Sequence, residues 1–144
     1  METKISKHDI AYLKMAIEWG NLSYCQRKKV GALIVKDRTI ISDGYNGTPS
    51  GFENVCEDCD GKTKWYVLHA EANAILKLAA STQSAMGATL YITLSPCGDC
   101  AKLIYQAGIK KVVFIEAYKD QKGVEMLQKA GIEVVQVALE SLKT

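Results

Sequence analysis

The chain has 144 residues, of which 24% are charged and 48% are hydrophobic. This length and composition predict a single globular domain over residues 1–144 and exclude extended disorder. The 18 lysines and arginines nearly balance the 16 acids, and the net charge of +2 is not gathered into a basic block. We therefore expect no nucleic-acid partner.

The sequence carries no signal for export or for insertion into a membrane. Residues 1–8 are mostly polar, and no apolar run approaches the length of a membrane span. Four of the five cysteines form two Cys-x-x-Cys pairs, Cys56/Cys59 and Cys97/Cys100. In a chain without an export signal, this spacing favours metal or redox chemistry over structural disulfides. We expect a cytoplasmic protein without membrane association.

The first part of the chain predicts a helix followed by a hairpin and a loop. Apolar residues recur at helical spacing over residues 8–20, and Ser6 is placed to cap this helix. Two segments rich in β-branched residues follow at 30–35 and 39–45, with a connection short enough for an antiparallel turn. Residues 46–65 contain glycine, proline and acidic residues without periodicity, which indicates a long loop of the kind that often carries function.

The second part of the chain alternates helices and strands. We expect a helix at about 69–80, a strand at 88–93, a strand at 112–116, a helix at 120–130 and a strand at 132–137. Another helix is predicted to begin at Ser95-Pro96, because serine caps helices and proline suits their first turn. The last two strands are expected to be parallel, since a helix connects them. The predicted fold is a three-layer α/β/α sandwich around a five-stranded mixed sheet.

Three residues have the chemical types and the spacing of zinc ligands. Cys97 and Cys100 lie three apart at a predicted helix start, where free N–H groups and the helix dipole favour thiolates. His69 opens the helix that follows the long loop. One imidazole and two thiolates, with the fourth position left to water, form a catalytic zinc site. We predict that His69, Cys97 and Cys100 bind one catalytic Zn²⁺.

Glu71 is the predicted catalytic residue. It lies two positions after His69, so the two side chains can share a site only at the open end of their helix. A carboxylate that lies beside zinc-activated water without binding the metal can shuttle protons. His-x-Glu together with Pro-Cys-x-x-Cys is a general signature of zinc-dependent deaminases. A thiol–disulfide oxidoreductase that uses Cys97 and Cys100, or a non-catalytic zinc module, is the alternative of a different class.

Beyond this motif, the sequence resembles the deoxycytidylate deaminases of the cytidine deaminase superfamily, most closely the phage and bacterial members. The resemblance extends from about Tyr24 to Glu116. It is carried by the blocks Val30-Gly31-Ala32, Gly44-Tyr45-Asn46-Gly47-Thr48-Pro49, His69-Ala70-Glu71-Ala72-Asn73-Ala74 and Ala107-Gly108-Ile109. It implies hydrolytic deamination of dCMP to dUMP and ammonia by a zinc-bound hydroxide, a reaction that supplies dUMP for thymidylate synthesis.

The same resemblance implies how the cytosine ring is held. Glu71 would deliver a proton to ring N3 and later protonate the departing amine. The Ala70 main-chain N–H, near the helix start, would bind the 2-oxo group. The Ser95 carbonyl would accept a hydrogen bond from the amine.

Five further residues are expected to contact the sugar or the phosphate by resemblance or by charge. Asn46 is similar to an asparagine that contacts the sugar, although Asn-Gly is also an ordinary turn pair. Asn73 resembles a residue near the sugar and the phosphate, and Tyr118 resembles one that closes the pocket. Arg27 and Lys29 belong to the basic cluster nearest in sequence, which can offset phosphate charge or form a solvated face.

Cys25, Cys56 and Cys59 are the cysteines that the catalytic site does not use. Some phage-type relatives carry a second, structural zinc in this region, and three thiols would supply most of such a site. The fourth ligand of such a site would have to be His8, a nearby carboxylate or a water. Three reduced cysteines are the alternative interpretation.

The resemblance also implies an assembly and its regulation. Family members are commonly hexamers that dCTP activates and dTTP inhibits, with Mg²⁺ accompanying the triphosphate effector. A nucleoside deaminase or a tRNA adenosine deaminase shares the zinc core and is the alternative within the superfamily, because the surrounding contacts select the base and its carrier.

Overall fold

The computed structural model of the chain describes residues 5–143. The elements in chain order are α1 (Lys7–Gly20), β1 (Gly31–Lys36), β2 (Thr39–Tyr45), α2 (Ala70–Ala79), β3 (Thr89–Leu94), α3 (Gly98–Gln106), β4 (Lys111–Glu116), α4 (Lys122–Lys129), β5 (Glu133–Gln136) and the 3-10 helix η1 (Leu139–Leu142). Every predicted helix and strand is present in this order. Only η1 has no counterpart among the sequence predictions for these residues.

The strands form one mixed sheet in the order β2-β1-β3-β4-β5. β1 is antiparallel to both of its neighbours, β2 and β3, whereas β3, β4 and β5 are parallel to one another. The predicted hairpin and the predicted parallel pair at the end of the chain are therefore confirmed. The parallel pairing also extends one strand further, because α3 connects β3 to β4 as a crossover helix.

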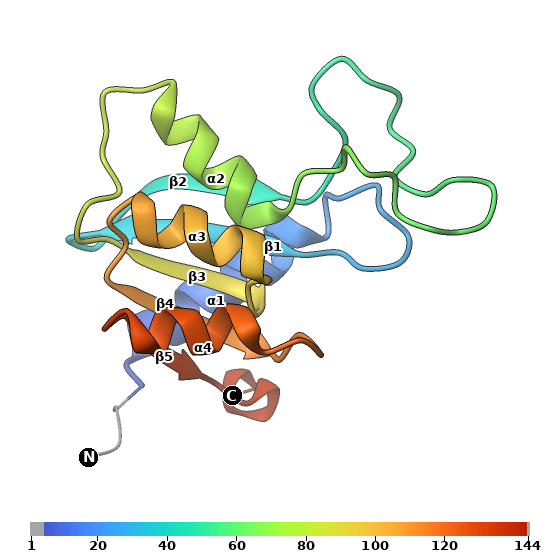
Figure 1. The fold of residues 1–144 in the computed structure, drawn as a ribbon. Coiled ribbons are helices and arrows are strands. Elements are labelled where there is room, and N and C mark those ends of the chain that lie inside the picture. Colours follow the sequence, from blue (N-terminus) through green and yellow to red (C-terminus); the bar gives the residue numbers. More distant parts are fainter. Residues whose placement is uncertain (1–4, 144) are drawn as a thin grey trace.

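Helices cover both faces of the sheet, which confirms the predicted three-layer architecture (Figure 1). α2, α3 and α4 lie on one face, while α1 and η1 lie on the other. Consecutive strand residues serve opposite layers: Ile34 and Val112 pack under α2 to α4, whereas Leu33 and Val113 pack against α1. No helix within residues 5–143 is both long and apolar enough to cross a membrane.

The helix α1 is tied to the sheet by polar contacts as well as by packing. Ser6 and Asp9 form a reciprocal capping box at its start, as the sequence predicts for Ser6. The buried Tyr91 of β3 donates its hydroxyl proton to the Asp9 carboxylate. Burial opposes ionisation of Asp9, but hydrogen bonds from Tyr91 and Ser6 outweigh it and lower its pKa.

The connection from β3 to α3 differs from its prediction. The helix begins at Gly98 with Cys97 as its N-cap, so the predicted start at Ser95-Pro96 is too early. Ser95 instead prolongs the pairing with β4, since its N–H donates to the Glu116 carbonyl at 2.8 Å. Its hydroxyl accepts the Tyr118 N–H at 2.7 Å. These bonds keep the backbone extended until Cys97.

Candidate active site

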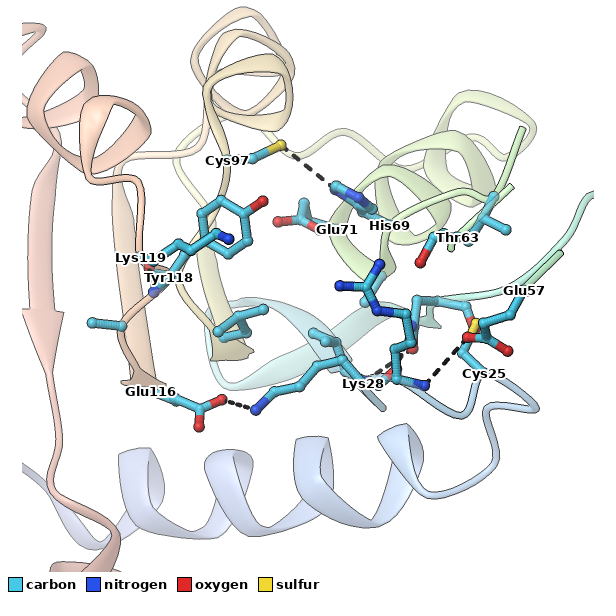
Figure 2. Close-up of a pocket in the computed structure, with 18 residues that line it drawn as sticks. Cys25, Lys28, Glu57, Thr63, His69, Glu71, Cys97, Glu116, Tyr118 and Lys119 are labelled. Atoms are coloured by element: carbon cyan, nitrogen blue, oxygen red, sulfur yellow. Dashed lines mark hydrogen bonds and ion pairs between the residues drawn. The ribbon is translucent and has the colours of Figure 1, made fainter. Parts of the chain in front are cut away.

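A pocket of about 570 Å³ opens at the end of the sheet where β3 and β4 finish. Its walls come from the starts of α2 and α3, from the loop after β4 and from the segment before β1. Figure 2 shows His69, Glu71 and Cys97 together on one side of this pocket. Carboxyl ends of parallel strands commonly hold ligands in open α/β sheets.

Helix starts place the predicted zinc ligands. His69 and Cys97 are the N-cap residues of α2 and α3, and both have extended backbones without a side-chain capping bond. Their side chains are therefore directed away from their own helices. Cys100 lies one turn into α3 and is buried, whereas His69 is exposed at the pocket. Two helix ends that are distant in sequence thus present one set of donors.

The spacing of these donors fits a zinc ion. The Nδ1 atom of His69 lies 3.5 Å from the Cys97 sulfur and 3.3 Å from the Cys100 sulfur. Ligands bound tetrahedrally at Zn–S of about 2.3 Å and Zn–N of about 2.0–2.1 Å are separated by roughly 3.5 Å. All three ligand atoms lie within 4.8 Å of one another. The structure therefore brings together the predicted donor set at distances suitable for zinc.

Shared protons couple the three donors. Hydrogen bonds from Cys100 and His69 lower the pKa of Cys97 to about 4. The hydrogen bond between Cys100 and Cys97, together with burial, raises the pKa of Cys100. The hydrogen bond between His69 and Cys97 raises the pKa of His69. The Cys97 thiolate thus accepts hydrogen bonds from both Cys100 and His69. A cation that displaced these protons would take over their stabilising role, as metal binding generally does at thiol sites.

The Glu71 carboxyl group is buried beside these donors, with the residue only 3% exposed. Burial raises its pKa to about 7, against the opposing effects of its hydrogen bond with its own main-chain N–H and of nearby His69. A group with a pKa near neutrality both accepts and releases a proton easily. Glu71 therefore has the properties of a proton shuttle.

The turn that carries Cys97 is supported from behind by α4. A Cβ atom at Gly123 would lie 2.5 Å from the Pro96 carbonyl oxygen and 2.7 Å from the main chain of Cys97. Only glycine allows the helix to approach this closely. The position of α4 therefore contributes to the position of a predicted zinc ligand.

Five of the residues predicted to contact the substrate line the same pocket as Glu71: Arg27, Asn46, Ala70, Ser95 and Tyr118. The Asn46 side chain also holds the segment before β1. Its oxygen accepts the Val30 N–H at 2.9 Å, and its amide donates to the Lys28 carbonyl at 2.7 Å. Each end of the amide has formed one hydrogen bond, so one further N–H can reach a ligand.

Two of the predicted contact residues lie outside this pocket. Asn73 lines a separate cavity of about 630 Å³, and its amide donates to the Tyr45 carbonyl at 2.8 Å. Lys29 is exposed and does not belong to the pocket wall, although Arg27 and Lys28 on its N-terminal side do.

Charged residues in the wall include three that the sequence analysis did not identify: Glu57, Glu116 and Lys119. Glu57 accepts the N–H groups of Gln26 and Arg27 at 3.1 and 3.2 Å. Lys119 directly follows Tyr118, so the assignment of Tyr118 was the available signal for it. Glu57 and Glu116 had no such signal, because their places depend on how distant segments meet.

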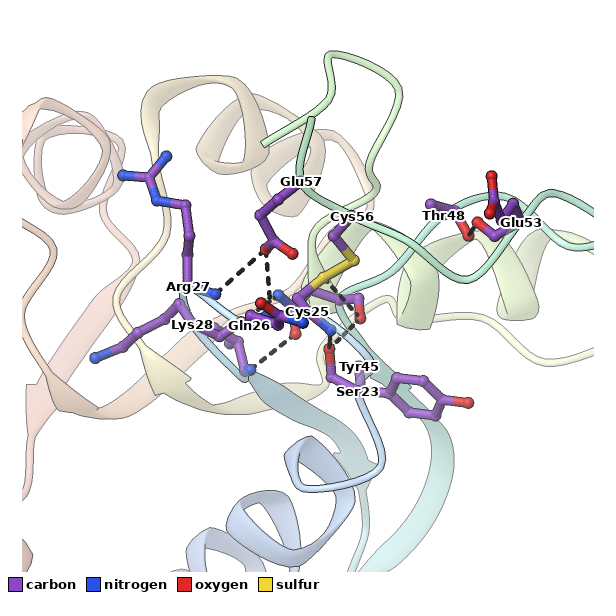
Figure 3. The surroundings of a disulfide bond; sticks show 12 residues. Ser23, Cys25, Gln26, Arg27, Lys28, Tyr45, Thr48, Glu53, Cys56 and Glu57 are labelled. Atoms are coloured by element: carbon purple, nitrogen blue, oxygen red, sulfur yellow. Dashed lines mark hydrogen bonds between the residues drawn. A yellow bond between two sulfur atoms is a disulfide. The ribbon is translucent and has the colours of Figure 1, made fainter. Parts of the chain in front are cut away.

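The expected grouping of Cys25, Cys56 and Cys59 as a second metal site requires correction. Cys25 and Cys56 form a disulfide, with their Cα atoms 5.1 Å apart (Figure 3). Cys59 is a free, exposed thiol. Disulfide sulfurs are not thiolates and do not serve as the predicted ligands. The preference for metal or reduced thiols over a disulfide was therefore wrong for this pair, because the loop that contains Cys56 folds back onto Cys25.

Comparison with known proteins identifies related sequences and structures. A family model described as "Cytidine and deoxycytidylate deaminase zinc-binding region" matches residues 6–116. The deoxycytidylate deaminase of Enterobacteria phage T4 is 40% identical over 83% of this chain and 84% of its own length. The dCMP deaminase of cyanophage S-TIM5, solved in complex with dCMP and dUMP, superimposes with a TM-score of 0.90. The two sequences are 46% identical, and the match covers 94% of this chain and 100% of the cyanophage chain.

A more distant comparison concerns the alternative within the superfamily. A deaminase that carries out A-to-I editing at the wobble position of tRNA is 23% identical, with a TM-score of 0.60. The match covers 88% of this chain and 97% of that protein. At this level the likeness extends to the fold alone.

Proposed function

The chain belongs to the cytidine and deoxycytidylate deaminase family, and we propose that its pocket hydrolyses dCMP to dUMP and ammonia. The observation that carries this proposal is the triangle of His69, Cys97 and Cys100 beside the buried carboxyl group of Glu71. A hydrolytic deaminase needs a metal-ligand set with an open position and a separate acid–base group. Both are present in one pocket.

The residues of the site have separate proposed roles in metal binding and in proton transfer. His69, Cys97 and Cys100 would hold Zn²⁺, which when bound lowers the pKa of water to about 7 and thereby supplies the nucleophile for C4. Glu71 would accept one proton from the attacking water and pass it to ring N3, and would then take the proton of the new C4 hydroxyl group and deliver it to the departing amine. Its pKa of about 7 suits both directions of transfer.

The remaining wall provides contacts for the rest of dCMP. The Ala70 N–H at the start of α2 is suited to the 2-oxo group, and the Ser95 carbonyl to the amine. Asn46 has one N–H left for the sugar, while Tyr118 borders the ring. Arg27 and Lys119 supply positive charge for the phosphate.

Parallel assays of dCMP, deoxycytidine and CMP test this assignment, with turnover followed by the absorbance change that accompanies loss of the amine. We expect dCMP to have the highest kcat/KM, because the nucleoside lacks the phosphate and CMP carries an additional hydroxyl. A preference for deoxycytidine would overturn the nucleotide assignment. Turnover of an adenosine in tRNA but not of dCMP would favour the alternative within the superfamily.

Metal analysis separates the deaminase from an oxidoreductase that uses Cys97 and Cys100. We expect about one zinc ion per chain after purification, and none in His69→Ala. A dithiol enzyme would retain little metal and would reduce a disulfide substrate instead. Zinc content without any deamination would favour a non-catalytic module.

Regulation and assembly follow from the family resemblance. We propose a cytoplasmic hexamer that dCTP, with Mg²⁺, activates and that dTTP inhibits. Size measurement by light scattering tests the hexamer. Rates at subsaturating dCMP test the effectors: dCTP should raise and dTTP should lower them, and an unchanged rate would contradict the regulatory proposal.

A further inference from the structure

An ion pair lines the end of the pocket remote from the proposed zinc ligands. Lys28, from the segment before β1, pairs with Glu116, the last residue of β4. Figure 2 shows this pair on the opposite side of the pocket from His69, Glu71 and Cys97. Both residues of the pair line the pocket. The pair therefore joins two walls at the position that the phosphate end of a bound nucleotide would approach.

The charges at this end can be accounted for individually. Three cations line the wall, namely Arg27, Lys28 and Lys119. Within residues 5–143 the structure assigns an ion pair only to Lys28 among these three. The Glu57 carboxylate also belongs to the wall, where it accepts the main-chain N–H groups of Gln26 and Arg27. The side-chain charges of Arg27 and Lys119 therefore remain for a ligand. One phosphate monoester carries about −1.5 to −2 at neutral pH, so these two cations match a single phosphate group.

A second phosphate group would meet a different environment. The next cation available to it is Lys28, and Glu116 already neutralises that residue. The Glu116 carboxylate would also repel the added negative charge directly. Selectivity often depends on such unfavourable contacts with the wrong ligand as much as on favourable contacts with the correct one.

We propose that Glu116 is a specificity residue that limits the substrate to nucleoside monophosphates, by pairing with Lys28 and by repelling a second phosphate group. This inference rests on the proposed function, because it assumes that a cytosine nucleotide occupies the pocket with its base at the zinc ligands. Glu116 acts on the ligand's charge and takes no part in bond making or breaking.

The test compares kcat/KM for dCMP and dCDP in the wild type, Glu116→Gln and Glu116→Lys. Glu116→Gln should raise the dCDP:dCMP ratio about tenfold, mainly through KM for dCDP, and Glu116→Lys should raise it further. Glu125→Gln removes one acid from the exposed side of α4, outside the pocket, and is the matched control. Its ratio should stay within about twofold of the wild-type value.

Two further measurements separate an electrostatic role from a structural one. Lys28→Gln leaves Glu116 without its partner and should lower kcat/KM for both nucleotides, while the double variant Lys28→Gln/Glu116→Gln should recover dCMP turnover. Raising the salt concentration tenfold should reduce the effect of Glu116→Gln, since half-exposed charges are screened. A merely structural pair would change both substrates equally and would leave their ratio unaltered.

The outcomes distinguish this inference from the function on which it rests. If the wild type turns over dCMP and the dCDP:dCMP ratio is the same in all three Glu116 forms, Glu116 does not set specificity, and the deaminase assignment stands. If the wild type turns over neither nucleotide, the proposed function fails and this inference fails with it. A ratio that rises as the charge at position 116 becomes more positive supports the proposal.

Discussion

At the residue scale, two neighbouring acidic groups of the pocket have pKa values shifted in opposite directions. Glu71, on α2, is buried and has a pKa raised to about 7. Cys97, the N-cap of α3, has a pKa lowered to about 4. The difference arises because Glu71 loses water on burial, while Cys97 gains hydrogen bonds from Cys100 and His69. These separate environments support the separate roles proposed for Cys97 in metal binding and for Glu71 in proton transfer.

Glu71→Gln tests the proton-transfer role without a change of side-chain shape. We expect kcat for dCMP to fall by about 10³-fold, because an amide cannot accept the proton, while the zinc content stays at about one per chain. Steady-state kinetics and elemental analysis on the same preparation provide the two readouts. Turnover within tenfold of the wild-type rate would rule out Glu71 as the proton shuttle, and loss of zinc would instead indicate a ligand role.

At the element scale, the position of α2 determines the position of His69 and Glu71. β2 approaches this helix closely: a Cβ atom at Gly44 would lie 2.5 Å from the Ala70 carbonyl oxygen. The Ser42 hydroxyl, on the same strand, donates to the Ala74 carbonyl at 2.6 Å. The strand and the helix start are therefore coupled by backbone contact.

Gly44→Ala should destabilise the protein by about 1–3 kcal/mol, because the new methyl group meets backbone atoms that cannot move aside cheaply. Gly47→Ala is a matched control on the same segment, since its Cβ would have nothing within 4 Å. Urea denaturation of both variants measures the difference. Equal free energies of unfolding would mean that β2 and α2 separate readily.

The contact between α1 and β3 predicts a dependence of stability on pH. The folded-state pKa of Asp9 lies below its ordinary value of 3.8, so the carboxylate stabilises the fold above that pH. This contribution is lost as the pH falls through the folded-state pKa. Protonation then removes the charge that accepts hydrogen bonds from Tyr91 and from the Ser6 N–H.

Asp9→Asn should therefore cost about 1–2 kcal/mol of unfolding free energy near pH 7. The difference from the wild type should shrink as the pH falls from about 3.8 through the folded-state pKa. Urea titrations across this range, with zinc removed from both proteins, provide the measurement. A difference that stays constant with pH would show that the Asp9 charge does not stabilise α1.

At the scale of the whole molecule, the proposed zinc ligands come from helix starts that are far apart in the chain. His69 precedes α2, whereas Cys97 and Cys100 belong to the start of α3. A metal bound to all three cross-links these helix ends and stabilises the folded chain relative to the unfolded one. The same fold brings the segment before β1 to the end of β4, where Lys28 meets Glu116.

Removal of zinc should consequently lower the Tm of the wild type by about 10 °C, as measured by calorimetry with and without a strong chelator. In His69→Ala the chelator should have little effect, because the site has lost a ligand. If both proteins respond equally to the chelator, its action does not depend on this site. An unchanged Tm in the wild type would contradict a stabilising metal.

Residue types and short spacings predicted the order of helices and strands, and they pointed to His69, Cys97 and Cys100 as the donor set and to Glu71 beside it. These features are local, since a Cys-x-x-Cys pair at a helix start or an apolar period is complete within a few residues. The tertiary structure alone decided that Cys25 bonds with Cys56, 31 residues away, and that Lys119 and Glu116 line the pocket. Such contacts depend on how loops fold against distant strands, and no local spacing encodes that.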